Sequence, residues 1–109
     1  MLKEIRAIVR PNRLAALRDA LRAVPDFPGL TILSAEGFTA PAAVGKRTVR
    51  EELTDYTSKV AVSVLAPEHA VERIIETIAS ACSTGQIGDG LIWVVPVERA
   101  IRVRDRSPL

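Results

Sequence analysis

The residues best suited to bind a ligand lie in the stretch Thr84-Gly85-Gln86-Ile87-Gly88-Asp89-Gly90, where three glycines fall within six positions. Glycine adopts positive φ and lets the backbone approach a ligand closely. Successive N–H groups of such a backbone form concavities that bind phosphate or carboxylate. Residues 84–91 are therefore interpreted as an anion-binding loop. A plain turn between a helix and a strand would also use Gly85 and Gly88, so spacing alone leaves both interpretations open.

A group of arginines follows this loop in the C-terminal segment, residues 99–106. Arg102 and Arg104 alternate with Ile101 and Val103, and in a strand that alternation directs both guanidinium groups to one face. The planar guanidinium suits phosphate oxygens. A solvated basic surface is the alternative, but the loop nearby favours a site for a phosphorylated ligand.

Other chemistry finds little support in the sequence. His69 is the only histidine and Cys82 the only cysteine, so neither a metal cluster nor an internal disulfide is expected. Ser63 and Ser83 lack a base nearby in sequence, so no catalytic triad is proposed. An acylphosphatase-like enzyme would need its anion loop directly after the first strand, where Arg10-Pro11-Asn12 contains no glycine. The chain is not expected to be an enzyme, and Trp93 is expected in the core or in a subunit interface.

The overall composition predicts one globular domain over residues 1–109, because 48% of the residues are hydrophobic and 26% charged. The net charge of +2 gives no reason to expect nucleic acid or membrane partners. No window reaches 18 apolar residues and the N-terminus lacks a small-residue cleavage site, so a cytoplasmic protein is expected.

The order of elements repeats: strand, proline, helix, turn, strand. Alternating or continuous apolar runs predict strands over residues 2–9, 30–34, 60–64 and 91–97, the last of them buried. Pro11 and Pro67 each precede a helix whose apolar stripe has helical spacing: Leu14, Leu17, Leu21 and Val24 in the first, and Val71, Ile74, Ile75, Ile78 and Cys82 in the second. This order predicts an α+β, ferredoxin-like βαββαβ fold with a four-stranded antiparallel sheet and two helices on one face.

Two features of this fold predict partners. The residues between the second and third strands, 39–58, show no sustained period, and so long a connection is typical of a functional or mobile loop. Its charges, which include Lys46, Arg47, Glu51 and Glu52, offer a partner a bipolar surface. The sheet face away from the helices also bears apolar residues, so other subunits are expected to cover it.

The order Thr-Gly-x-Ile-Gly-Asp-Gly, a short apolar strand and then Val-Glu-Arg-Ala-Ile-Arg-Val-Arg resembles the C-terminal signature of the PII signal-transduction proteins. The stretch Ile5-Arg6-Ala7-Ile8-Val9-Arg10-Pro11, the step Gly29-Leu30-Thr31 and the pair Gly37-Phe38 extend the resemblance to nearly the whole chain. The family implies a homotrimer without a cofactor that binds adenine nucleotides between subunits and regulates a partner transporter or enzyme through its long loop. The positions that match its nucleotide site are Thr31, Gly37, Phe38, Lys59, Gly85, Ile87, Gly88, Asp89, Gly90, Arg102 and Arg104.

The chain also departs from this pattern. Leu91 stands where the family usually has a phosphate-binding lysine, and Pro41 stands where it has the glutamine that helps to hold Mg²⁺ and 2-oxoglutarate. Ser63 replaces a glutamate that approaches the adenine, and the stretch with the modified tyrosine is absent. A divergent PII-like sensor is therefore expected, one that prefers ADP or AMP to Mg-ATP and is not uridylylated. Bicarbonate is a candidate second ligand. The alternatives are a PII-like regulator of a metal-efflux system and a ferredoxin-like trimeric metal-tolerance module.

Overall fold

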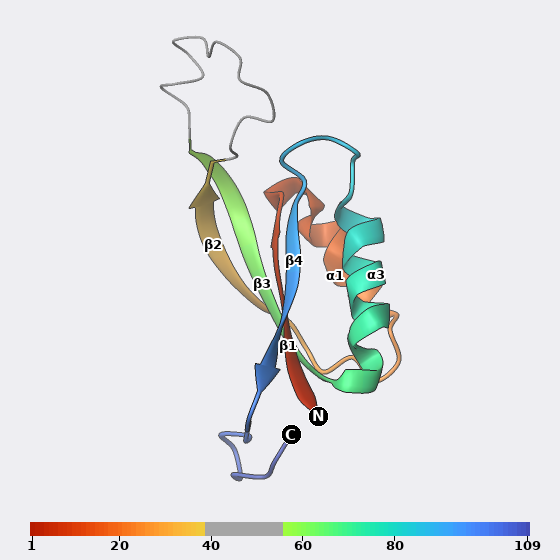
Figure 1. Ribbon diagram of the computed structural model, residues 1–109, viewed down its shortest axis with the longest axis vertical. Coiled ribbons are helices and arrows are strands. Elements are labelled where there is room, and N and C mark those ends of the chain that lie inside the picture. Colours follow the sequence, from red (N-terminus) through yellow and green to blue (C-terminus); the bar gives the residue numbers. More distant parts are fainter. Residues whose placement is uncertain (39–55) are drawn as a thin grey trace.

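A computed structural model of the chain describes residues 1–38 and 56–109. Four strands form one antiparallel sheet: β1 (Leu2–Val9), β2 (Thr31–Gly37), β3 (Thr57–Pro67) and β4 (Gly90–Val97). Their order across the sheet is β2-β3-β1-β4, so β1 and β3 are central and β2 and β4 are edges. This is the predicted ferredoxin-like arrangement, and Figure 1 shows both helices on one side of the sheet.

The helices begin where proline fixes φ before the first turn. A single 3-10 turn, η1 (Pro11–Arg13), leads into α1 (Leu14–Arg22). The second half repeats this design, since η2 (Glu68–Ala70) follows Pro67 and leads into α3 (Val71–Cys82). The repeat predicted from the two prolines is confirmed.

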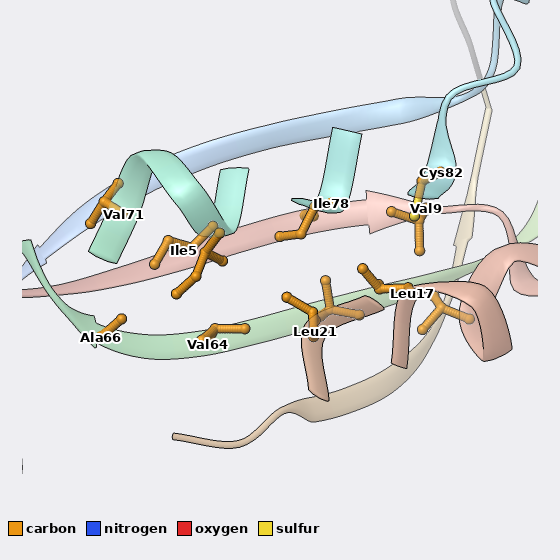
Figure 2. Packing of buried hydrophobic residues seen from close by; sticks show 13 residues of the cluster. Ile5, Val9, Leu17, Leu21, Val64, Ala66, Val71, Ile78 and Cys82 are labelled. Carbon is orange, nitrogen blue, oxygen red and sulfur yellow. The ribbon is translucent and has the colours of Figure 1, made fainter. Parts of the chain in front are cut away.

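One core lies between the helices and the sheet (Figure 2). In β1 and β3 every second residue points toward the helices and is buried, because successive strand side chains alternate between faces. The apolar stripes of α1 and α3 fill the same space. The largest fully buried side chains of the whole core are Ile5, Val9, Leu17, Leu21, Val64, Ile74 and Ile78.

The opposite face of the sheet has no helix over it among the described residues. Apolar side chains stand exposed there, including Leu33 at 67% and Leu91 at 65%. Trp93 lies on the same face and is 36% exposed in the single chain. A polar trio, Glu4, Arg6 and Ser63, interrupts this surface. The expectation of a second apolar face is confirmed.

Two local expectations were wrong. The apolar run Leu91–Val97 is not a buried strand in one chain, because β4 lies at the sheet edge and most of its residues are partly exposed. The third strand begins at Thr57, three residues earlier than its apolar alternation indicated.

The greater part of the long loop expected over 39–58, with Pro41, Glu52 and the charged residues at 46–51, lies outside the described residues. Within the described ranges, no helix is long and apolar enough to cross a lipid bilayer.

Candidate functional site

The Gly-rich loop between α3 and β4 is folded around the carboxylate of Asp89. That carboxylate accepts hydrogen bonds from the backbone N–H of Thr84 at 2.7 Å and of Gly85 at 2.9 Å, and from the Thr84 hydroxyl. Arg10 Nε lies 3.2 Å away on the other side. The hydrogen bonds from Thr84, with smaller help from Arg10 and Gly85, hold the pKa of Asp89 well below its usual range. The ionised carboxylate of Asp89 therefore holds the two ends of the loop together through these hydrogen bonds.

This arrangement leaves only some of the loop amides available to a ligand. The N–H groups of Thr84 and Gly85 are occupied by Asp89, and the N–H of Asp89 donates to the Gln86 carbonyl at 3.3 Å. Within the part of the chain that the structure describes, the N–H groups of Ile87 and Gly88 have no partner. These two amides are the donors that the loop offers to an external anion.

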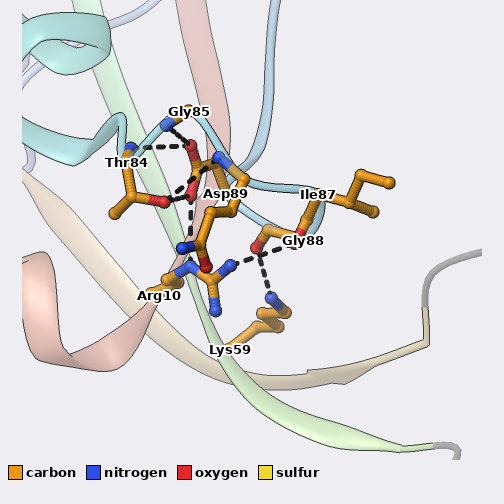
Figure 3. A network of polar contacts seen from close by, with 8 residues as sticks. Arg10, Lys59, Thr84, Gly85, Ile87, Gly88 and Asp89 are labelled. Carbon is orange, nitrogen blue, oxygen red and sulfur yellow. Dashed lines mark hydrogen bonds and ion pairs between the residues drawn. The ribbon is translucent and has the colours of Figure 1, made fainter.

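Two cations lie against the loop at Gly88 (Figure 3). Arg10, the residue after β1, donates from Nη2 to the carbonyl of Ile87 at 3.1 Å. Lys59 on β3 donates from Nζ to the carbonyl of Gly88 at 2.7 Å. Both side chains approach so closely that a Cβ at Gly88 would lie 3.2 Å from Arg10 Nη2 and 3.9 Å from Lys59 Nζ. Asp89 together with Arg10 and Lys59 therefore carries one net positive charge at the loop.

Gly90 fastens the loop to the central strand. Its φ is +120°, and a Cβ at this position would overlap the backbone carbonyl of Ile8. Only glycine allows this approach, since it has no Cβ and tolerates positive φ. The start of β4 is thereby held directly against the end of β1.

The residues matched to a nucleotide site fall into two groups in the single chain. The loop residues Gly85, Ile87, Gly88, Asp89 and Gly90 lie at one end of the sheet, near Lys59 and the Gly37-Phe38 step that ends β2. Thr31 begins β2 at the opposite end, where the C-terminal segment also lies (Figure 1). Thr31 and Gly37, the two ends of β2, are six residue steps apart, a span of roughly 20 Å. One chain does not bring these groups together.

Arg102 and Arg104 do not lie in a strand, so the condition under which both would share one face is not met. An isolated bridge between Ile101 and Pro108 closes a short hairpin, and Val103 is at its turn, 99% exposed. The Arg102 guanidinium donates to the Pro108 carbonyl at 2.9 Å, whereas Arg104 lies 3.6 Å from the carboxylate of Asp105. The two arginines are therefore held differently instead of sharing a strand face.

A cleft of about 430 Å³ lies beside this second group. Thr31, Leu65 and Arg99 are among its lining residues, and so are Glu4 and Ser63. The Ser63 hydroxyl donates to Glu4 at 2.6 Å, and the same carboxylate pairs with Arg6 at 2.8 Å. The cleft thus combines apolar walls with one carboxylate and one guanidinium.

Sequence reasoning missed Arg10 and Glu4. Arg10 follows β1 directly and precedes Pro11, which ends the strand. Its position at the C-terminal end of this strand could therefore have been inferred from the sequence. Its link to Asp89 depends on the register that pairs Val9 with Gly90, which the sequence does not state. Among residues 1–38 and 56–109, no three His, Cys, Asp or Glu side chains gather to hold a metal ion, and His69 is exposed.

Comparison with known proteins agrees with this fold and loop. The model of the family described as Nitrogen regulatory protein P-II matches residues 2–107. The chain is 37% identical over 110 residues to the Nitrogen regulatory protein P-II of Azospirillum brasilense, covering 94% of this chain and 92% of that one. It is 35% identical over 104 residues to the protein of the same name from Pyropia yezoensis, with the same two coverages. The chain belongs to the P-II family of signal-transduction proteins.

A solved structure supports the same conclusion. The crystal structure of Arabidopsis thaliana PII bound to citrate superposes with a TM-score of 0.80 at 32% sequence identity. The match covers 98% of this chain and 87% of that chain. The ferredoxin-like fold is therefore shared with a PII protein over almost the whole length.

Proposed function

We propose that this chain, as a single PII-like domain, forms a trimeric sensor that binds an adenine nucleotide between neighbouring subunits. The observation that carries the proposal is the division of the matched site residues between opposite ends of one sheet. A neighbouring copy that places its Thr31 and Arg102 end against the Gly88 loop of the first would complete the site. The exposed apolar face around Trp93 supplies the surface on which copies associate.

The Gly88 end is suited to phosphates. It offers the two unpartnered amides of Ile87 and Gly88, with the cations of Arg10 and Lys59 beside them. Anion binding at such backbone concavities is common. The related Arabidopsis thaliana PII has been crystallised with citrate, which is also a polyanion. Both observations favour an anionic ligand.

The cleft at the other end is suited to a base. Apolar walls at Leu30 and Leu65 accept a planar ring, and Thr31 lines the same cleft. The Glu4 carboxylate, held by Ser63, provides an acceptor for the exocyclic amino group of adenine. Glu4 would then serve where the family pattern has a glutamate at position 63.

Charge favours a nucleotide with fewer than three phosphates. Leu91, at the exit of the loop, is an exposed apolar side chain where the family pattern has a lysine. Each charge-assisted hydrogen bond that is missing costs about 1.5–3 kcal/mol, and the loss falls on the outer phosphates. ADP or AMP should therefore bind better than Mg-ATP, without 2-oxoglutarate. A small anion such as bicarbonate would fit the cationic space left free.

Regulation is proposed to pass through the 39–58 loop, which contacts a partner transporter or enzyme. The ends of β2 and β3 hold the base of this loop together. There the Thr57 hydroxyl donates to the Gly37 carbonyl at 3.1 Å, and the Phe38 and Tyr56 rings meet edge to face at 5.3 Å. A nucleotide bound beside Gly37 would touch the loop where it leaves the sheet. The sequence of the loop and the identity of the partner, and not the shared fold, determine whether the regulated process concerns carbon, nitrogen or metal ions.

The test combines mass and affinity. Light scattering should give about three times the chain mass of 11.8 kDa, and calorimetry with AMP, ADP and ATP, each with and without Mg²⁺, should give the tightest binding for ADP or AMP. Arg102→Ala should weaken every phosphorylated ligand. A monomer at micromolar concentration would remove the intersubunit site. Mg-ATP binding tenfold tighter than ADP, or tightened by 2-oxoglutarate, would reject the stated preference.

A further inference from the structure

Arg10 bridges two parts of the anion loop from a position outside it. Its Nε lies 3.2 Å from Asp89 Oδ1, and its Nη2 donates to the Ile87 carbonyl at 3.1 Å. The side chain is 29% exposed and comes from the segment between β1 and η1, 77 and 79 residues away from its partners in sequence. Arg10 is not one of the positions matched to the family's nucleotide site.

We propose that Arg10 orients the Ile87–Gly88 peptide so that the Gly88 N–H faces an incoming phosphate. Arg10 is on this account a positioning residue of the anion loop, and its contribution does not require contact with the ligand. The proposal rests on the nucleotide site proposed above and adds to it a residue on which phosphate affinity depends.

The orientation follows from peptide geometry. The described peptide bonds are trans, and in a trans peptide the C=O and N–H point in opposite directions. Because Arg10 binds the Ile87 carbonyl, the N–H of Gly88 points away from Arg10. The next peptide is fixed in the same manner, since Lys59 binds the Gly88 carbonyl and the Asp89 N–H donates to Gln86. The Gly88 N–H is thus held on the side opposite Arg10, with no described partner.

This peptide needs an anchor because Gly88 restrains it weakly. Its φ is +97°, in a region where glycine moves between conformations at little cost. A rotation of the peptide plane would replace the outward N–H with an outward carbonyl, which repels a phosphate. The fork of Arg10 resists that rotation because one end is tied to Asp89, whose carboxylate is itself held by Thr84 and Gly85. A lysine ammonium also has several donors, but they rotate on a flexible stem and lack this fixed fork geometry.

The charges at the loop distinguish the orienting role of Arg10 from a simple electrostatic attraction between Arg10 and the phosphate. Arg10 and Asp89 largely neutralise one another, and Lys59 is the remaining cation in contact with the loop among the described residues. Arg13 on η1 provides a matched control, because it is a half-buried arginine three residues away that makes no described hydrogen bond to the loop. Removing Arg13 removes one positive charge and leaves the Ile87–Gly88 peptide anchored.

The experiment compares Arg10→Met, Arg10→Lys and Arg13→Met with the natural chain, using ADP, adenosine and inorganic pyrophosphate as ligands. Arg10→Met should weaken ADP at least about tenfold, the size of one charge-assisted hydrogen bond, and leave adenosine unchanged. Arg10→Lys keeps the charge but not the fork and should also weaken ADP. Arg13→Met should stay within about twofold of the natural chain, as a screened charge predicts. In amide NMR spectra, pyrophosphate should shift the Gly88 N–H of the natural chain and leave that of Arg10→Met unshifted.

Several results would overturn the proposal: full ADP affinity in Arg10→Met, an equal loss for adenosine, or full rescue by Arg10→Lys. If Arg10→Met does not fold, Arg10→Lys decides by the same criteria. If the natural chain binds no nucleotide, the proposed function fails, whereas the pyrophosphate shift at Gly88 still tests the role of Arg10. A shift that is the same in natural chain and variant would reject that role.

Discussion

The Ser63 hydroxyl donates a 2.6 Å hydrogen bond to the Glu4 carboxylate, although the two residues are diagonal neighbours in the sheet rather than opposite one another. The register pairs Ser63 with Arg6, which binds the other oxygen of the same carboxylate. Glu4, on the central strand β1, thus places a carboxylate beside β3, within a polar trio that interrupts the apolar face.

The Glu4–Ser63 contact should be measurable in a double-mutant cycle. Glu4→Ala and Ser63→Ala should each destabilise the fold, with a coupling energy of about 1 kcal/mol, because the contact is shielded by the sheet. Urea unfolding measures it. Glu76 and Ser80 form the same kind of pair on the exposed side of α3, where coupling should stay below about 0.5 kcal/mol. Equal coupling in both pairs would contradict the role of the sheet face.

Asp89→Asn should destabilise the chain in a manner that depends on pH. The folded state lowers the pKa of Asp89, so the carboxylate contributes stability above its unfolded pKa, and that contribution fades as pH falls toward the folded value. The difference in unfolding free energy between the natural chain and the variant should therefore be largest at pH 7 and shrink progressively below about pH 4. Urea unfolding at pH 7, 5 and 3 measures it. Asp19→Asn, an exposed carboxylate on α1, is the control; a gap for Asp89→Asn that is constant with pH would refute the assignment.

Gly90→Ala should be among the most damaging substitutions in the chain. The added methyl group would overlap the Ile8 carbonyl at positive φ, so a loss of at least about 3 kcal/mol is expected. Gly85→Ala has a similar backbone problem, with φ at +79°, but nothing within 4 Å of the new atom. It should cost only about 1–2 kcal/mol. Thermal unfolding compares the two, and equal losses would show that the contact with Ile8 is not decisive.

Trp93→Asp should separate the subunits if copies associate through the open face of the sheet. The substitution removes the apolar contact of the indole and adds the desolvation cost of burying a carboxylate between copies, and both effects oppose association. Light scattering should then give the mass of one chain, while circular dichroism keeps the signal of a folded chain. Ala15→Asp adds the same charge on the exposed side of α1 and should leave the assembly unchanged. A Trp93→Asp variant with the natural mass would place the interface elsewhere.

The fold could be predicted closely because its pattern is local. In β1 the high content of Ile, Val and Leu over residues 2–9 indicates a strand, and the structure buries Ile5, Ala7 and Val9 of that run. In α3 the spacing of Val71, Ile74 and Ile78 does the same for a helix. Each signal depends on neighbours a few positions away, which sequence records directly.

The errors came from contacts between distant parts of the chain. The alternation from Ile101 to Arg104 is strand-like, but the bridge to Pro108 and the left-handed φ of Arg106, +63°, fold the segment back on itself. The run after Gly90 is apolar enough for a central strand, yet the chain topology puts β4 at the edge. Likewise, the glycines predicted a loop. The position of the Asp89 carboxylate inside that loop and its contact with Arg10 depend on the register between β1 and β4, which the sequence does not show.

The closure at the ends of β2 and β3 has a consequence for how such a protein can evolve. Gly37 pairs with Thr57, and the rings of Phe38 and Tyr56 meet just beyond them, so the chain leaves the sheet and returns to it at one fixed point. The entropy of closing the intervening segment grows only slowly with its length. Selection can therefore exchange that segment as a cassette, with different length and charge, without rebuilding the sheet or the Gly88 loop. Under the proposed function, the partner that the loop contacts can therefore change in evolution while the ligand site on the sheet stays the same.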